Sequence, residues 1–285
     1  LRITDVHLTP QNDDVRVLLR VELTGEVTDG SLTYANAPPR LGRTLSISTD
    51  LYEVDGRIRA VGERDTLATE SKRVILRQTM SADAADAVTA GDEIRVGGRT
   101  VATIEDVTAY ATNDPTQRRV FVAANLTTHR QQDDWRFGGT SVNRGQQVVL
   151  STAEYTLQGT IERIGGDLQL GEPTTRTVTL RMQEVDADIA EAVTPGMTER
   201  VGDQTVARVT DVETEPSLII ATGDNGSVNV AGHPTDREVT ITADLLVRET
   251  SSGTQFKGEP LRIGSQPTLD LGTVTVNATV INVGE

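Results

Sequence analysis

One segment bounded by glycines occurs three times along the chain and constrains the fold more than any other feature. Its copies are Gly42–Gly62, Gly145–Gly165 and Gly264–Gly284. Each copy alternates apolar and polar residues with a period of two, as a β-strand requires, because successive side chains of a strand point to opposite faces. The segment therefore predicts a pair of β-strands that has been copied along the chain.

The copies align with one another without gaps over their apolar positions. The equivalent residues are Leu45 and Val148, Ile47 with Leu150 and Leu269, Tyr52 with Tyr155 and Val274, Val54 with Leu157 and Val276, and Ile58 with Ile161 and Val280. Because the apolar phase of the alternation is kept in all three copies, we expect these side chains to face a core.

Related sequence also precedes the second and third copies. Arg73–Val107 resembles Thr177–Val212, whereas Leu1–Val6 matches only the last residues of that segment. The repeat period of roughly 100–120 residues suits a string of domains and is too long for a solenoid. We divide the chain into an incomplete first repeat at 1–70, which has only the second half of a unit, a second repeat at 71–172 and a third repeat at 173–285.

Each complete repeat begins with the same expected elements. A strand at Arg73–Gln78 is followed by a short helix that Ser81 caps and Gly91 ends. A hairpin then turns at Gly97-Gly98. The counterparts are a strand at Thr177–Met182 and a hairpin turning at Gly202-Asp203.

A proline-containing loop and a long strand come next. The loops are expected at Asn113–Pro115 and Gly232–Pro234. On one face of the long strand lie Val17, Leu19, Val21 and Leu23 in the first repeat, Val120, Val122, Ala124 and Leu126 in the second, and Val239, Ile241, Ala243 and Leu245 in the third. One aromatic residue (Tyr34, Phe137 or Phe256) follows each long strand before the glycine-bounded segment.

These patterns predict an all-β protein of tandem small β-barrels, each with one short helix. Closure into a barrel removes exposed strand edges, which favours it for a sheet of about six strands. A two-sheet sandwich is the alternative architecture.

The composition indicates the environment. The chain carries a net charge of −15 and no cysteine. Of its 27 basic residues only Lys72 and Lys257 are lysines. Such an acidic, lysine-poor chain suits multimolar salt, where the Debye length falls to about 3 Å and self-repulsion is screened. We therefore expect a halophilic organism, most readily an archaeon.

The charge pattern and hydropathy exclude several partner classes. Nucleic-acid binding requires clustered Lys and Arg, whereas the arginines here alternate with acids, so we expect no nucleic-acid partner. The sequence has no apolar run of the length that crosses a membrane and no visible signal peptide. Membrane attachment is expected only through a segment that this sequence does not contain.

The segments Gly91–Gly165 and Gly196–Gly284 resemble the family catalogued as domain of unknown function 4330. The shared features are the glycine turns and the strand alternation, as in GMTERVGDQTVARVTDV and GSQPTLDLGTVTVNATVINVG. Members of this family, which is common in halophilic archaea, typically place a β domain outside the membrane behind one hydrophobic helix. The resemblance implies an extracellular or cell-surface location and no catalytic residues.

No residue pattern indicates catalysis, a cofactor or a metal. His7 and His129 are expected at strand ends and His233 in a loop, each solvated and without a second histidine at ligand spacing. The acidic groups at Asp133-Asp134 and around Asp186, Asp188 and Glu191 lack the glycine-centred order of a calcium loop, and diffuse Na⁺ or K⁺ condensation is the favoured interpretation. We therefore expect no enzyme.

Four residues are candidate sites of modification or contact. Asn125, Asn225 and Asn277 begin N-x-S/T sequons and are expected to face solvent, as a glycan requires, with Asn225 the strongest candidate. Trp135 is the only tryptophan and aligns with Leu32 and Thr254, so we interpret it as a contact residue for a protein or a carbohydrate.

The favoured function is that of a non-enzymatic structural or interaction protein of the cell exterior, either anchored to a membrane or assembled into a surface filament. The open edge of the first repeat predicts protein partners, including other copies of the chain joined head to tail or by strand donation. The alternative is an envelope module that binds a small ligand or a glycan.

Overall fold

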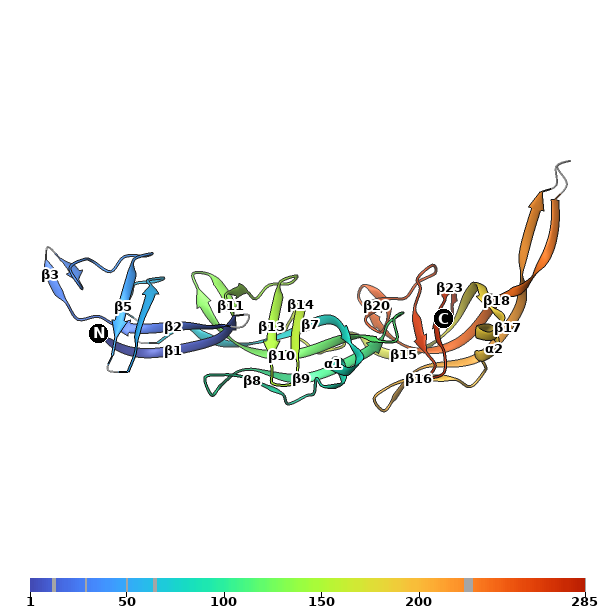
Figure 1. The fold of residues 1–285 in the computed structure, drawn as a ribbon, viewed down its shortest axis with the longest axis horizontal. Coiled ribbons are helices and arrows are strands. Elements are labelled where there is room, and N and C mark those ends of the chain that lie inside the picture. Colours follow the sequence, from blue (N-terminus) through green and yellow to red (C-terminus); the bar gives the residue numbers. More distant parts are fainter. Residues whose placement is uncertain (12–13, 29, 50, 64–65, 223–227, 285) are drawn as a thin grey trace. The chain divides into compact units, whose positions relative to one another are not determined.

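The computed structural model describes residues 1–11, 14–28, 30–49, 51–63, 66–222 and 228–284 (Figure 1). About 65% of the chain is strand and 4% helix, with two curled half-barrel sheets and two short helices. The expected all-β class of tandem domains is therefore confirmed.

The elements recur in a constant order. The first repeat contains β1 (Arg2–Gln11), β2 (Asp14–Glu22), β3 (Glu26–Thr28), β4 (Ser31–Thr33), β5 (Thr44–Ser48) and β6 (Glu53–Arg57). The second contains β7 (Thr69–Ser81), α1 (Ala82–Asp86), β8 (Glu93–Val96), β9 (Arg99–Ala111), β10 (Gln117–Gln131), β11 (Asp134–Phe137), β12 (Thr140–Ser141), β13 (Gln147–Ser151) and β14 (Thr156–Ile164).

The third repeat follows the same order. It contains β15 (Glu172–Asp186), α2 (Ala187–Ala192), β16 (Thr198–Val201), β17 (Gln204–Thr222), β18 (Val228–Thr250), β19 (Gly253–Phe256), β20 (Glu259–Pro260), β21 (Thr268–Asp270), β22 (Thr275–Asn277) and β23 (Thr279–Val283). By this order β1 and β2 correspond to β9 and β10, and the described part of the first repeat has no counterparts of β7, α1 and β8.

Each complete repeat builds one curled sheet. The second has the strand order β12-β11-β10-β7-β14-β13, with β9 on β10 and β8 on β9. The third has the order β16-β17-β18-β15-β23, with β19 on β18 and β20 on β19. In the described part of the first repeat the strands pair only two by two, as β1-β2, β3-β4 and β5-β6.

Two compact units can be distinguished. One comprises Leu1–Gln78, Thr89–Asp106 and Val122–Gly165, and the other comprises Thr79–Val88, Val107–Phe121 and Gly166–Glu285. The division at 1–70, 71–172 and 173–285 stays a prediction, and we use first, second and third repeat as names for those sequence ranges.

The alternation of the long strands produces the core. Val120, Val122, Ala124 and Leu126 are fully buried, as are Val239, Ile241, Ala243 and Leu245. The local signals also act as expected: the Ser81 hydroxyl accepts the amide of Ala84 at the start of α1. Gly97 and Gly98 both take positive φ in the β8–β9 turn, which only glycine adopts freely.

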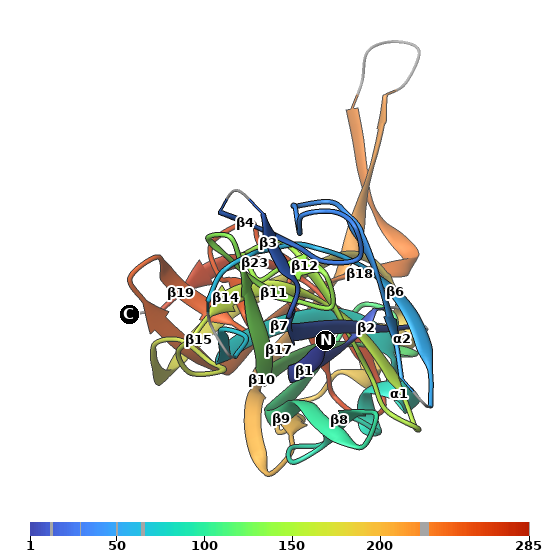
Figure 2. The same ribbon diagram turned by 90° about the vertical axis from the view of Figure 1, so that its left-hand side faces the viewer.

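One loop expectation is wrong. Gly232–Pro234 lies inside β18, because β17 and β18 remain paired beyond an irregularity between Pro216 and Leu218. The continuation, Leu218–Thr222 paired with Val228–Gly232, projects from the rest of the third repeat (Figures 1 and 2). The irregular pairing accommodates the proline that suggested a loop.

Candidate interaction surfaces

A hairpin of one repeat contacts a two-residue turn of the next, and we call this contact a joint. At the first joint the β1–β2 hairpin meets the turn Gly138-Gly139, between β11 and β12. A Cβ on Gly138 would collide with the carbonyl oxygen of Pro10, and one on Gly139 would lie 2.5 Å from Nη1 of Arg16. Both positions of this turn therefore require glycine for two reasons, the positive φ and the close approach of the hairpin.

The first joint buries two histidines. The rings of His7 on β1 and His129 on β10 lie 5.2 Å apart, and both side chains are buried. Burial lowers the pKa of His129 to about 4, assisted by His7, Arg16 and Arg136. Burial also lowers the pKa of His7, against the attraction of Asp5. Both rings are therefore neutral at pH 7, and the expectation that these two histidines are solvated is wrong.

The second joint has the same construction. There the β9–β10 hairpin meets the turn Lys257-Gly258, between β19 and β20. Arg119 forms an ion pair with Glu259 at 3.0 Å, and the ring of Phe121 lies over Gly258. Thr268 donates a hydrogen bond to the side chain of Asn113. The hairpin is thus held by polar contacts and by one close packing contact.

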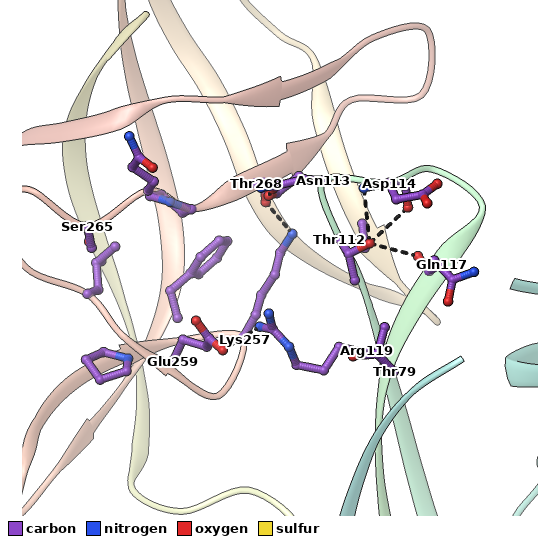
Figure 3. A pocket seen from close by; sticks show the side chains of 16 residues that line it. Thr79, Thr112, Asn113, Asp114, Gln117, Arg119, Lys257, Glu259, Ser265 and Thr268 are labelled. Carbon is purple, nitrogen blue, oxygen red and sulfur yellow. Dashed lines mark hydrogen bonds and ion pairs between the residues drawn. The ribbon is translucent and has the colours of Figure 1, made fainter. Parts of the chain in front are cut away.

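A cavity of about 510 Å³ lies at the second joint (Figure 3). Its lining is polar and apolar in about equal parts, and its polar residues include Asn113, Asp114, Arg119, Lys257, Glu259 and Thr268. The amine of Lys257 points toward Thr268 within it (Figure 3). Hydroxyl, amide, carboxylate and guanidinium groups together suit a hydroxyl-rich ligand, and the carboxylates of Asp114 and Glu259 disfavour an anion.

Lys257 belongs to a buried ion pair in the third repeat. Its Nζ donates to Oε1 of Glu199 on β16 and, at 2.7 Å, to the carbonyl oxygen of Thr268. Burial lowers the pKa of Lys257 and raises that of Glu199, while their mutual attraction opposes both shifts. The second repeat has Ile94 and Gly138 at the equivalent positions. The pair is therefore a specific addition to the third repeat.

Several apolar side chains of the first repeat are exposed although their equivalents in the second repeat are buried, whereas Leu45 and Ile47 on β5 are buried in both. Val17 on β2 is 52% exposed, whereas its equivalent Val120 is fully buried. Val54 on β6 is 41% exposed, whereas its equivalent Leu157 is fully buried. The two apolar patterns are the same, so the difference in exposure comes from the elements that cover them.

The equivalent tyrosines Tyr52 and Tyr155 show which elements cover the apolar side chains of the second repeat. Tyr155 is buried and donates a hydrogen bond of 2.6 Å to the Asp92 carboxylate, between α1 and β8. Burial and this bond raise the pKa of Tyr155. Burial would raise the pKa of Asp92, but the hydrogen bonds from Tyr155 and Thr89 outweigh it and lower that pKa. In the first repeat Tyr52 is 45% exposed.

The other predicted residues occupy separate places. Trp135 is half-buried on β11, with Nζ of Lys72 4.8 Å from its ring centroid. Asn277 on β22 is exposed. Asn125 on β10 is half-buried, and its amide nitrogen donates to Glu105 at 2.8 Å. Asn225 lies outside the described residues.

Sequence reasoning missed the joints and the ion pair. The pairs His7–His129 and Lys257–Glu199 are distant in sequence, so no local spacing relates them. One signal for the second was available, namely a lysine in a turn position of a chain that has only two lysines. The third histidine, His233, is half-buried beside Asp236, so the expectation that it is solvated is met only in part.

Two further properties follow from the described residues. Among them no group of three His, Asp or Glu side chains comes together as a metal-ion site. Neither short helix of the described chain, nor any other helix in it, has the length and hydropathy to cross a bilayer.

Comparison with known proteins gives one match. No curated protein and no solved structure matches the chain. Residues 169–284, which are nearly the whole third repeat, match the model of the family described as Domain of unknown function (DUF4330). This part of the chain is therefore similar to members of that family.

Proposed function

We propose that the chain is a non-enzymatic structural and interaction protein of the exterior of a halophilic archaeal cell, and that its tandem β repeats join proteins together. The exposed apolar side chains of the first repeat carry this proposal. Val17, Tyr52 and Val54 have covered equivalents in the second repeat and are 41–52% exposed in the first. An apolar face of this kind favours a protein partner.

The acidic composition supports the halophilic part of the proposal. At low salt the charge of −15 is unscreened, so thermal stability should rise steeply between dilute and multimolar KCl. Circular dichroism across a salt titration measures this, and equal stability at both ends contradicts it.

The exposed Asn277 is the described sequon best placed for a glycan, and intact mass of native protein tests that modification. Membrane attachment is proposed through a segment outside this sequence.

Photo-crosslinking in producing cells tests the protein-binding role. Benzoylphenylalanine is placed at Tyr52 and, as the matched control, at Tyr155. We expect an adduct of protein mass at position 52 and none at position 155, because Tyr155 is covered within its own repeat. Absence of a protein adduct at position 52 contradicts the proposal.

The cavity at the second joint favours a second function, the binding of a small ligand or glycan by an envelope module. Its volume is within the range of ligand pockets, and Arg119 and Asn113 offer donors to it. Native mass spectrometry of protein purified from its own cells tests this. A bound small molecule that Arg119→Ala removes supports it, and an unliganded mass contradicts it.

A further inference from the structure

Four side chains at the first joint carry buried polar atoms that have no hydrogen-bond partner in the described part of the chain. The atoms are Nε2 of His7, Oγ1 of Thr9, both ring nitrogens of His129 and Nε of Arg136. The side chains of His7, Thr9 and His129 are only 7%, 0% and 1% exposed, so bulk water does not hydrate them. Buried polar atoms in folded proteins nearly always have a partner, because one that lacks it keeps the full cost of its desolvation.

These atoms belong to one cluster. The rings of His7 and His129 lie 5.2 Å apart. Thr9 follows His7 by two residues on the same buried face of β1. Arg136 faces His129 across the β10–β11 pair, and its Nη1 donates at 2.7 Å to the carbonyl oxygen of Gly139. The unpartnered atoms of β1, β10 and β11 therefore converge where the hairpin meets the turn.

The second joint satisfies the equivalent positions with a protein group. Thr108 is equivalent to His7, and Tyr110 to Thr9. The side-chain amide of Gln169 donates to both hydroxyls, at 3.3 Å to Thr108 and at 3.0 Å to Tyr110. The repeat thus uses a hydrogen-bonding group at this place. At the first joint the described residues do not supply one, so a ligand is the remaining source.

The charge around the cluster selects the kind of ligand. A Cβ on Gly139 would lie 2.5 Å from Nη1 of Arg16, so the guanidinium groups of Arg16 and Arg136 both approach this turn. The charged groups that act together with burial on the pKa of His129 are all basic, namely His7, Arg16 and Arg136. A metal cation would be repelled by these groups, although imidazole is a common metal ligand.

Two carboxylates border the cluster and have partners of their own. Asp5 attracts His7, but its two oxygens accept two backbone amides, each at 2.8 Å. Asp134 lies 3.8 Å from Nη2 of Arg136, and its side chain is 55% exposed. Neither carboxylate accepts from the unpartnered atoms, so an acceptor for these donors has to come from outside the described chain.

From these contacts we propose that the first joint binds a small monovalent anion, which is chloride in a saline medium. The donors are the Thr9 hydroxyl, Nε–H of Arg136 and one N–H of each neutral histidine ring, and Arg16 adds electrostatic attraction. A halide ion accepts several hydrogen bonds and donates none, which suits a set of groups that can all donate. This inference does not depend on the protein partner proposed above.

Urea unfolding of the 285-residue chain at constant multimolar potassium tests the proposal when chloride replaces glutamate stepwise as the anion. Glutamate keeps the ionic strength and is too large for a buried cluster of this kind. Thr9→Val removes one donor and keeps the shape of the side chain. Thr128→Val is the matched control, because Thr128 is equally buried but its hydroxyl donates to the carbonyl oxygen of Glu70 at 2.6 Å.

At a chloride concentration about ten times the dissociation constant, binding to the folded state raises the folding equilibrium constant about tenfold. The wild type and Thr128→Val should gain this factor when chloride replaces glutamate, over and above any change in Thr9→Val. Arg16→Gln, at a half-buried position, should also lose the gain and serves if Thr9→Val does not fold. Salt effects common to all four proteins cancel in this comparison.

Crystals grown in KBr give the direct result. An anomalous peak of bromide is expected between Thr9, His129 and Arg136. An equal effect of chloride on the wild type, Thr9→Val and Arg16→Gln overturns the proposal, and so does the absence of a bromide peak at this place. A stabilisation of the wild type that EDTA abolishes would show that the ligand is a metal ion and would overturn it as well.

Discussion

The first and second repeats carry the same apolar pattern and differ in what covers it. In the second repeat β10 pairs with β7, and Val120 on β10 is fully buried. In the first repeat the equivalent strand β2 pairs only with β1 among the described strands, and Val17 on β2 is 52% exposed. Alternation therefore determines which side chains form a face, but it does not determine whether that face becomes a core or a binding surface. The covering elements decide this.

The largest expected effect is the difference in stability when the same substitution is made at two equivalent positions. Val120→Asp places a carboxylate in a dry core and should cost about 4 kcal/mol or more of unfolding free energy. Val17→Asp should cost no more than about 0.5 kcal/mol, because the carboxylate remains hydrated. Chemical denaturation of both variants in high salt measures the difference. Similar losses for the two would show that Val17 is covered within the chain.

The buried ion pair allows a comparison of the third repeat with the second. Glu199→Ile leaves the Lys257 ammonium buried without its carboxylate and should destabilise the chain by about 3–5 kcal/mol. Adding Lys257→Gly restores the arrangement of the second repeat, and glycine also suits the positive φ of that position. The double variant should therefore recover most of the loss in denaturant unfolding. A double variant as unstable as Glu199→Ile would contradict this account of the pair.

The first joint should make stability depend on pH through His129. Its pKa is about 4 when folded and 6.5 in the unfolded chain, so between these values the unfolded state binds more protons. The stability contributed by neutral His129 is fully present above about pH 6.5, decreases as the pH is lowered and is lost by about pH 4. The total is on the order of 3 kcal/mol for His129. Unfolding of wild type and His129→Gln across this range checks it, and parallel curves would be the contrary result.

The smallest expected difference in stability is between substitutions at the equivalent tyrosines Tyr155 and Tyr52. Tyr155→Phe removes the hydrogen bond to Asp92 and should cost about 1–2 kcal/mol, because the acceptor is a carboxylate. Tyr52→Phe should change the unfolding free energy by less than about 0.5 kcal/mol, since Tyr52 is 45% exposed. Thermal melts of both variants measure this. An equal loss for Tyr52→Phe would indicate that Tyr52 has a comparable partner.

The local elements could be predicted because their signals are local. Gly97-Gly98 needs positive φ, Ser81 caps α1, and the period of two places Val120 and Val122 on the buried face. The loop expected at Gly232–Pro234 is strand, because its turn-like composition is a local signal, whereas the pairing of β18 depends on Leu218–Thr222 across the hairpin.

The joints could not be predicted from local patterns. His7 approaches His129, and Lys257 approaches Glu199, only because strands distant in sequence curl past one another.

Hydrogen–deuterium exchange followed by mass spectrometry tests most directly the claim that the first repeat is a binding face left open in a single molecule. In dilute protein at high salt, β2 should exchange much faster than its equivalent β10. When the protein captured by crosslinking at position 52 is added, β2 should gain protection while β10 stays unchanged. A β2 strand as protected as β10 without that partner, or one that exchanges equally fast with and without it, would contradict the account.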